Sequence, residues 1–321
     1  KGKFKSLCNL FDLPIVEEYQ IDDISNLNQL KSIRFPVIVK PADNSGGRGI
    51  TLCKNQQGFI EAYKRALAFS ENKSVIVERY MKSKEATIFY LIHDGEIFLT
   101  GIGDRHTKDN QKDVIPLPVA YTFPSCYLDT YLDDLNYKVV EMFKSIGMKN
   151  GMIFIQSFVE KGKFIFYEMG YRLTGSLEYK IMEPLIGVDP LELMIKFAIT
   201  GEMGEVDTLK KLNPKWDSYS CNITFLAKPG QIKTIKGIEE VLSFTEVVDA
   251  FPSYKEGDVI PENAKGTLQQ VVLRVFAIAK TKNHLIEVMD RIHEAISVTS
   301  IDDDDMLLDK FNTMELLYEK N

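Results

Sequence analysis

FPVIVKPADNSGGRGI, residues 35–50, joins a β-branched run between two prolines to a segment rich in glycine. The run from Phe35 to Pro41 predicts a buried strand, and the glycines after it predict a turn. Strand character resumes from Ile50 to Cys53. We therefore expect a β-hairpin whose connection carries several glycines.

Lys40 lies at the end of this strand, and an ammonium group in apolar surroundings needs an anionic partner. A phosphate would be such a partner. Directly after it, Ser45, Gly46, Gly47 and Gly49 predict a loop whose backbone N–H groups can approach phosphate oxygens, because larger side chains would obstruct them. A plain hairpin turn is the alternative for the glycines taken alone.

Helices and strands follow on both sides of this hairpin. The apolar residues between Lys3 and Leu13 recur at helical spacing, and Pro14 ends that helix. The other predicted elements are, in chain order, a helix over 58–70, strands over 74–81, 86–92 and 96–101, an irregular polar stretch over 103–113, a helix over 129–146, a hairpin over 151–172, and helices over 190–200, 283–296 and 305–318.

Two of these elements carry polar residues that need an explanation. Glu78 interrupts an otherwise apolar strand, so it needs hydrogen-bonding partners, unless the strand is an edge and Glu78 faces water. In the later hairpin, strand alternation puts Glu168, Gly170 and Arg172 on one face. A three-residue loop would place Gln156 opposite Glu168, whereas a two-residue turn would place them on opposite faces.

Composition narrows the class of protein. The 321 residues are 45% hydrophobic, which allows two or three compact units. A net charge of −7 argues against a protein that mainly binds nucleic acid. The four cysteines are widely spaced and predict reduced thiols. No apolar run approaches the roughly 20 residues of a membrane span, and the first residues do not resemble a signal peptide, so we expect a cytoplasmic protein.

The hairpin over 35–50 and the strand VIVERYM, residues 75–81, resemble the ATP-grasp superfamily, in which ATP lies between two α+β subdomains beneath a glycine-rich loop. The resemblance supports phosphate contacts for Lys40 and the glycine loop. It further implies an adenine pocket at Glu78, Arg79 and Met81, a ribose contact at Glu85, a phosphate contact at Lys1, a nucleotide contact at His106 and a catalytic role for Lys108.

The same superfamily has an acidic residue on one strand of a hairpin and the run E-x-N-x-R on the other. Gln156, Glu168, Gly170 and Arg172 stand at those positions here, so two of the four depart from the pattern. The resemblance implies that Gln156 and Glu168 hold Mg²⁺, although an amide oxygen is a weaker ligand than a carboxylate and glycine is none. It also implies that Arg172 stabilises the charge that develops during acyl transfer.

The expected fold is therefore α+β, with an ATP-grasp fold of two subdomains that clasp ATP and a C-terminal α+β subdomain. The expected boundaries are a linker helix over 1–30, a small subdomain with the phosphate-loop lid over 31–80, a central subdomain with the metal hairpin over 81–205 and the C-terminal subdomain over 206–321. Members usually begin with a Rossmann-like domain of about a hundred residues before the equivalent of Lys1, and we expect this chain to lack it.

The activity that the resemblance implies is an ATP-dependent ligase that joins a carboxylate to an amine through an acyl phosphate, with ATP and Mg²⁺ as cofactors. The expected substrate is an amino acid or another small carboxylate. Two alternatives stay open: a bicarbonate-activating enzyme of the carboxylase or carbamoyl-phosphate-synthase type, and an ATP-binding module without catalysis. The expected partners are ATP and the two small substrates, without nucleic acid or membrane, and either a homodimer or a chain that supplies the N-terminal domain.

Overall fold

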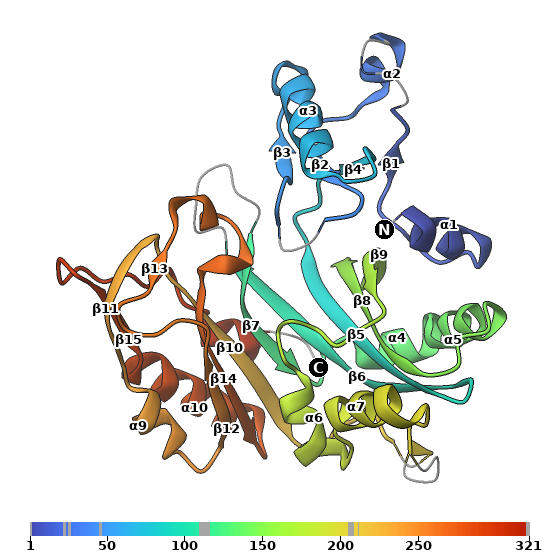
Figure 1. Cartoon of the computed structure of the whole chain (residues 1–321). Helices are drawn as coiled ribbons and strands as arrows, with labels where there is room; N and C mark the ends of the chain where they lie inside the picture. Colours follow the sequence, from blue (N-terminus) through green and yellow to red (C-terminus); the bar gives the residue numbers. More distant parts are fainter. Residues whose placement is uncertain are drawn as a thin grey trace.

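The computed structural model describes residues 2–21, 24, 27–44, 47–108, 116–204, 209–210 and 212–318. Figure 1 shows a small lobe above a larger body that is built around a long, twisted sheet. The chain enters at α1 (Gly2–Leu10), which packs against the body through the buried side chains of Phe4 and Cys8. The mixed helix and strand content confirms the predicted α+β class.

The small lobe is a four-stranded antiparallel sheet in the order β1-β4-β2-β3. Its strands are β1 (Glu18–Tyr19), β2 (Val37–Pro41), β3 (Thr51–Cys53) and β4 (Val75–Arg79), and its helices are α2 (Leu27–Ser32), η1 (Gln56–Gly58) and α3 (Phe59–Phe69). Phe59, Ala62 and Ala66 of α3 pack on Val37 and Val39 of β2, which explains the apolar spacing along both elements. The predicted hairpin is confirmed, because β2 pairs with β3.

The body contains an eight-stranded antiparallel sheet in the order β12-β14-β10-β7-β6-β5-β8-β9. Its strands are β5 (Lys84–His93), β6 (Glu96–Lys108), β7 (Leu117–Phe123), β8 (Gly151–Glu160), β9 (Lys163–Gly170), β10 (Tyr219–Leu226), β12 (Val247–Pro252) and β14 (Val271–Ala279). Strand β4 of the small lobe ends at Arg79, and β5 of this sheet begins at Lys84, so the two lobes are joined by the short segment over 80–83.

Alternation along the central strands divides this sheet into two faces. On β5, Ile88, Tyr90 and Ile92 pack with α1, α4 (Leu128–Asp134) and α5 (Asn136–Ser145). Phe89 and Leu91 point the other way and pack with α6 (Tyr179–Ile186) and α7 (Pro190–Thr200). The second face is only partly covered by these two helices, and its other end carries the polar residues described below.

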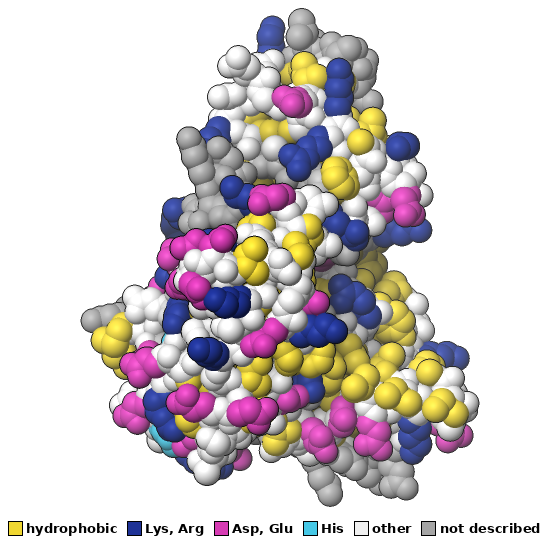
Figure 2. All heavy atoms as spheres, turned by 60° about the vertical axis from the view of Figure 1, so that its left-hand side comes forward, with side chains coloured by type: hydrophobic (Ala, Val, Ile, Leu, Met, Phe, Trp, Pro, Cys, Tyr) yellow, Lys and Arg dark blue, Asp and Glu magenta, His cyan; other side chains and the backbone are white. Residues whose placement is uncertain are grey.

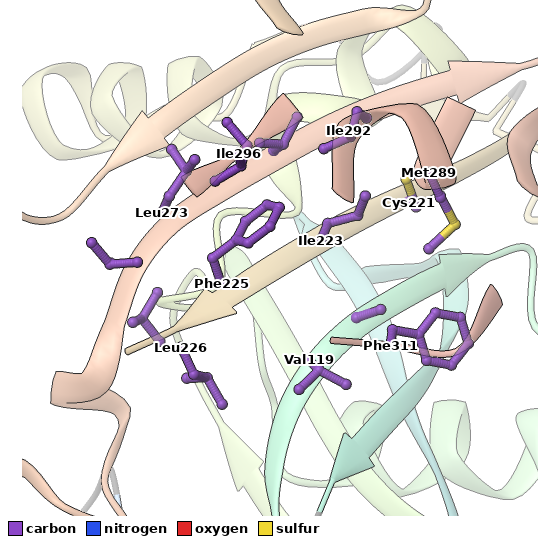
Figure 3. Close-up of a cluster of buried hydrophobic side chains, with 14 of the residues drawn as sticks. Val119, Cys221, Ile223, Phe225, Leu226, Leu273, Met289, Ile292, Ile296 and Phe311 are labelled. Atoms are coloured by element: carbon purple, nitrogen blue, oxygen red, sulfur yellow. The ribbon is translucent and has the colours of Figure 1, made fainter. Parts of the chain in front are cut away.

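The C-terminal part adds a third, three-stranded sheet in the order β13-β11-β15. The strands of this sheet are β11 (Gly230–Lys236), β13 (Val259–Ile260) and β15 (Ser297–Ser300). The helices of the C-terminal part are α9 (Ile238–Leu242), η2 (Glu262–Ala264), η3 (Leu268–Gln270), α10 (Lys282–Ala295) and η4 (Thr313–Tyr318). Figure 3 shows Met289 and Ile292 of α10 beside Ile223, Phe225 and Leu273 of β10 and β14. This apolar contact fixes α10 on one face of the large sheet.

Three sequence predictions about secondary structure were wrong. The polar stretch after residue 103 is not irregular up to Lys108, because β6 continues there and pairs with β5 and β7. The helix expected over 129–146 is two helices that meet at Leu135. The helix expected over 305–318 is an extended segment followed by a short 3-10 helix, because residues 305 and 307 make bridges to neighbouring chain segments.

Two further properties follow from the described residues. The four cysteines are free, and Cys8, Cys53 and Cys221 are buried, which confirms that they are thiols. Among the helices that the structure describes, none combines the length and the apolar character that crossing a bilayer requires.

Candidate active site

A cavity of about 840 Å³ is lined by both lobes, from Lys40 and Glu78 in the small sheet to Arg105 and Glu168 in the large one. Ten of the residues singled out from the sequence line it: Lys40, Gly47, Glu78, Arg79, Met81, Glu85, His106, Gln156, Glu168 and Arg172. Residues up to 132 positions apart, such as Lys40 and Arg172, therefore share one site.

The buried lysine has an anionic partner within the protein, in addition to the phosphate contact that the sequence suggests. Lys40 Nζ lies 2.5 Å from Glu78 Oε2, and both side chains are about 5% exposed. Lys5 of α1 forms a second buried ion pair with Glu78 and lies 3.2 Å from Glu18. Burial alone would raise the pKa of Glu78, but Lys40 and Lys5 outweigh it and hold that pKa below its usual range.

This network also answers why Glu78 stands in an apolar strand. Register pairs Glu78 with Ile38 on one side and Glu18 on the other, so it lies in the interior of the small sheet and not on an edge that faces water. Its carboxylate joins α1 to the small sheet at the rim of the cavity. Lys5 was not predicted, because its neighbours in the sequence resemble those of any surface lysine on an amphipathic helix.

The glycine-rich connection is only partly described. Lys1, Ser45 and Gly46 lie outside the described residues. Gly47 lines the cavity, whereas Gly49 is not among the lining residues. A Cβ on Gly49 would lie 2.8 Å from Phe69 Cβ, and the backbone there has φ +74°, so packing and conformation explain this glycine.

The segment that links the lobes contributes Arg79 and Met81 to the cavity wall. Met81 is buried, as expected for an apolar pocket wall. Arg79 is half-exposed and lies 3.3 Å from Glu160 at the end of β8. This ion pair connects the small lobe to the hairpin β8–β9 beside the cavity.

A row of polar side chains crosses the floor of the cavity from strand to strand. Register places Tyr121 of β7 opposite Arg105 of β6, and Arg105 opposite Glu85 of β5. Arg105 forms a buried ion pair with Glu85 and donates to the Tyr121 hydroxyl at 3.3 Å. Tyr167 also donates to Glu85, at 2.8 Å. Burial opposes the charge of Arg105, but Glu85 raises its pKa further above the usual range.

His106 and Lys108 follow Arg105 on β6 but differ in their surroundings. His106 lines the cavity, its Nε2 lies 2.8 Å from the Thr122 hydroxyl, and its ring packs 4.3 Å from that of Phe311. Burial, with nearby lysines, lowers its pKa to about 3, so the imidazole is neutral at physiological pH. Lys108 is not among the lining residues, and its Nζ lies 2.8 Å from Glu315 of η4.

The hairpin β8–β9 brings Gln156 opposite Glu168 by a route that the sequence did not predict. The connection is a two-residue turn at Lys161-Gly162, since Glu160 pairs with Lys163. A regular ladder from this turn would pair Gln156 with residue 167. A β-bulge at Tyr167 adds one residue to β9, and Gln156 then pairs with Glu168. The prediction that a two-residue turn separates them was therefore wrong.

Arg172 follows β9, and its guanidinium lies 5.0 Å from the ring centroid of Phe154. Its Nη1 also donates to the carbonyl of Leu173 at 2.7 Å. Phe154 pairs with Gly170 across the hairpin, so the ring fills the space beside the glycine and supports the guanidinium from below. Arg172 is thereby held at the cavity by a cation–π contact.

The donor set can be compared with the needs of Mg²⁺. Among the described residues no group of three or more histidine, cysteine, aspartate or glutamate side chains could form a metal cage. Mg²⁺ is commonly held by one or two carboxylates together with phosphate oxygens and water. Glu168 and the amide oxygen of Gln156, adjacent on the cavity wall, fit that arrangement as a partial ligand set.

Sequence reasoning missed several cavity residues. Arg274 of β14 and the segment from Thr174 to Ser176 line the cavity beside the C-terminal part. Arg105 was noticed only as part of a polar stretch. A single arginine in the apolar run VVLRVF was the available signal for Arg274, comparable to the signal that drew attention to Lys40 and Glu78.

The cavity differs in charge from the chain as a whole. Of the residues that the structure describes, seven lysines and arginines and four glutamates line it, whereas the chain has a net charge of −7. Figure 2 shows acidic and basic side chains interspersed over one outer face. The cavity is thus suited to an anionic ligand, since an excess of positive charge with low-dielectric walls concentrates anions.

A small lobe that carries a lysine hairpin, placed over a sheet that carries a carboxylate hairpin and an arginine, defines the ATP-grasp class of proteins. The model of the family "Carbamoyl-phosphate synthase L chain, ATP binding domain" matches residues 1–206. The chain belongs to this family.

Curated relatives include carboxylases and a ligase. The chain is 29% identical over 210 residues to the 2-oxoglutarate carboxylase small subunit of Hydrogenobacter thermophilus, which covers 62% of this chain and 43% of the relative. It is 24% identical over 162 residues to dapdiamide A synthase of Enterobacter agglomerans, which covers 48% of this chain and 37% of the relative. The matches thus span less than half of these relatives.

Solved structures share the fold over nearly the whole chain. The biotin carboxylase domain of the H. thermophilus 2-oxoglutarate carboxylase, solved with MgADP and bicarbonate, has a TM-score of 0.72 at 18% identity and covers 96% of this chain and 66% of that one. The L-amino acid ligase of Bacillus licheniformis has a TM-score of 0.72 at 17% identity and covers 94% and 71%. These likenesses confirm the ATP-grasp fold.

Proposed function

We propose that the protein is an ATP-dependent ligase that joins a small carboxylate to an amine through an acyl phosphate. The observation that carries this proposal is that Lys40, the Gln156–Glu168 pair and Arg172 line one cavity between the lobes. The family of ATP-binding domains to which the chain belongs supports ATP as the nucleotide. The relative solved with MgADP supports Mg²⁺.

In the proposed arrangement the small lobe forms the lid over the nucleotide. Lys40 and Gly47 contact the phosphates, Glu78, Arg79 and Met81 line the adenine pocket, and Glu85 lies at the ribose. The undescribed Lys1, Ser45 and Gly46 belong to the same proposed phosphate site. Glu78 and Glu85 also organise the buried lysine and arginine pairs, so their role includes positioning the cations of the site.

The first step joins an oxygen of the substrate carboxylate to the γ-phosphorus, and the bond to the β–γ bridging oxygen breaks to release ADP. Glu168 and Gln156 would hold Mg²⁺, which when bound would supply neutralisation of the negative charge on the transferred phosphoryl group. The amine then attacks the acyl carbon, phosphate leaves, and the amine loses a proton. Arg172 stabilises the negative charge on the acyl oxygen, because its guanidinium is held at the cavity over Phe154. His106 stays neutral, so it can contact the nucleotide only through hydrogen bonds and not as a cation. Lys108 has to leave its ion pair with Glu315 before its ammonium group can assist the reaction.

Magnesium-dependent ADP release, measured with a panel of carboxylates and amines, tests this proposal. We expect release that requires both a carboxylate and an amine, and a loss of about 100-fold for Arg172→Lys. Arg291→Lys, a half-exposed arginine of α10, is the matched control and should behave as the wild type. ADP release that is independent of every organic carboxylate and amine contradicts the proposal.

Bicarbonate activation is the second candidate, and the carboxylase relatives favour it. In that case ADP release depends on bicarbonate and not on the organic carboxylate in the same panel. A third candidate is an ATP-binding module without catalysis, which Gln156 and Gly170 favour because they replace stronger metal ligands. That candidate is supported if nucleotide binds with Mg²⁺ and no panel member promotes ADP release.

A further inference from the structure

Arg274 is a buried cation at the end of the cavity farthest along the sheet from Glu168. It lies on β14, which is six strand positions from β9 in the large sheet. Its neighbours Leu273 and Val275 pack in the core beneath α10, so alternation directs Arg274 to the opposite face, where it lines the cavity. The residue is only 5% exposed.

The hydrogen bonds of Arg274 leave most of its guanidinium unused. Nη1 donates to the Thr224 hydroxyl, 2.6 Å away on the neighbouring strand β10. Within the part of the chain that the structure describes, no carboxylate forms an ion pair with Arg274. Lys40 and Arg105, the comparable buried cations of this cavity, each form an ion pair with a glutamate.

The Glu178 carboxylate acts electrostatically on Arg274 and favours its charged form, but the two side chains form no ion pair. Glu178 is fully buried, accepts a hydrogen bond from the Thr174 hydroxyl and lies 3.4 Å from Asn222 Nδ2. Asn222 also donates to the carbonyl of Ser176 at 2.7 Å. These contacts fix the segment from Thr174 to Ser176 at the wall of the cavity that Arg274 also lines, and they occupy the Glu178 carboxylate with neutral donors. Arg274 therefore has a favourable charge nearby but no carboxylate in direct contact.

A guanidinium has five N–H donors in a planar fork that matches a carboxylate or phosphate, and it stays protonated when it is buried. Burial lowers the pKa of Arg274 from its usual value, which reflects the cost of a desolvated charge. That cost is offset when an anion enters the cavity and binds the free donors. In the proposed function Arg172 already stabilises the charge on the acyl oxygen, and its position after β9 places it at the Glu168 end of the site.

We infer that Arg274, anchored by Thr224, binds a second anionic group of the activated substrate, one that the reaction does not consume. This inference rests on the proposed ligase function and narrows its substrate to molecules with at least two anionic groups, such as dicarboxylates. Bicarbonate, which has a single carbon, cannot present a second anion to Arg274 while it occupies the phosphate end of the cavity.

The test compares dicarboxylates with their monoamides, which have nearly the same shape and one charge fewer. Binding of succinate, glutarate, succinamate and glutaramate to the full chain is measured by calorimetry with saturating MgADP and again without nucleotide. We expect the wild type to bind a dicarboxylate at least tenfold more tightly than its monoamide. In Arg274→Gln this difference should fall below twofold, and Arg274→Lys should keep part of it.

Thermal unfolding distinguishes ligand binding from a structural role. Arg274→Gln removes a buried charge that has no ion-pair partner in contact, so its midpoint should stay close to that of the wild type, whereas a structural arginine would give a clearly lower one. Thr224→Val keeps the guanidinium but removes its anchor and should lose part of the discrimination.

Equal affinity of the wild type for diacid and monoamide, absence of any dicarboxylate binding, or discrimination that survives in Arg274→Gln each overturns the inference. Discrimination that depends on Arg274 in a chain that does not bind MgADP would leave the anion site standing and remove the ligase proposal. The two failures are therefore distinguishable.

Discussion

The ring of Phe154 occupies the space that a side chain on Gly170 would need. A Cβ built on Gly170 would lie 2.3 Å from Phe154 Cε1 and 2.4 Å from Cζ. The same ring lies beneath Arg172, at 5.0 Å from its guanidinium carbon. The departure of Gly170 from the E-x-N-x-R pattern is thus coupled to the packing that holds the proposed catalytic arginine.

Gly170→Asn should therefore not restore a metal ligand by itself. The new side chain collides with the Phe154 ring in a packed cluster, and overpacking of this kind typically costs about 1–3 kcal/mol. We expect urea unfolding to report a loss of this size, together with weaker Mg²⁺-dependent nucleotide binding because Arg172 is displaced. Gly58→Asn, where no atom lies within 4 Å of the added Cβ, is the control and should leave both properties unchanged. Tighter Mg²⁺ binding by Gly170→Asn at full stability would contradict this account.

Glu78→Gln should strongly destabilise the protein at neutral pH, because it leaves Lys40 and Lys5 buried without their shared carboxylate. Breaking a buried pair by removing one partner typically costs about 3–5 kcal/mol. Urea unfolding at pH 7 measures this loss. Glu160→Gln, which breaks the half-exposed pair with Arg79, is the matched control and should cost less than about 1 kcal/mol. Similar losses in the two variants would contradict the buried network.

The effect of Glu78→Gln should also depend on pH. The pKa of Glu78 is lower in the folded protein than its ordinary value of 4.5, so the charged carboxylate stabilises the fold above that value. As the pH falls through the folded pKa, the carboxylate is protonated and this stabilisation is lost. The difference in unfolding free energy between wild type and Glu78→Gln should therefore shrink below pH 4.5. A difference that stays constant from pH 7 into this acidic range would argue against the charge pairing.

His106 should remain neutral throughout the physiological range. Its pKa of about 3 in the folded state lies below the ordinary value of 6.5, so protonation favours the unfolded chain. The contribution of His106 to stability is therefore complete above pH 6.5 and declines as the pH falls below it. The NMR signals of the His106 ring, assigned with His106→Asn, should not titrate between pH 5 and pH 8. A titration midpoint of the His106 ring near pH 6 would contradict this prediction and would allow His106 to bind phosphate as a cation.

Lys108→Met should have little effect on stability, because its ion pair with Glu315 is partly exposed to solvent. Such pairs typically contribute about 0–1 kcal/mol to the free energy of unfolding, and urea unfolding measures whether the loss stays within this range. If Lys108 assists catalysis, ADP release falls in Lys108→Met while the affinity for MgADP is retained. Glu315→Gln, which releases Lys108, should instead keep or raise the rate. Unchanged turnover in Lys108→Met would remove this residue from the proposed machinery.

Much of the fold could be predicted from local patterns. The hairpin around Lys40 and the helix that ends before Ser70 depend on the preferences of neighbouring residues. The structure contains both, as β2 paired with β3 and as α3. The β6 strand was cut short in the prediction because its last residues are polar. Pairing with β5 and β7 satisfies their backbone groups, and such partners are invisible in a local window.

For the candidate site, the amino-acid sequence by itself determined which side chains are chemically competent: a lysine at a buried strand end, an acidic residue in an apolar strand, and a carboxylate and arginine on one hairpin. Only the tertiary structure decided how they meet. It pairs Lys40 with Glu78, moves Glu168 opposite Gln156 through a bulge at Tyr167, and brings Arg274 to the same cavity. The physical reason is that ion pairing, strand register and cavity shape depend on residues far apart in the chain, whereas residue chemistry and local periodicity do not.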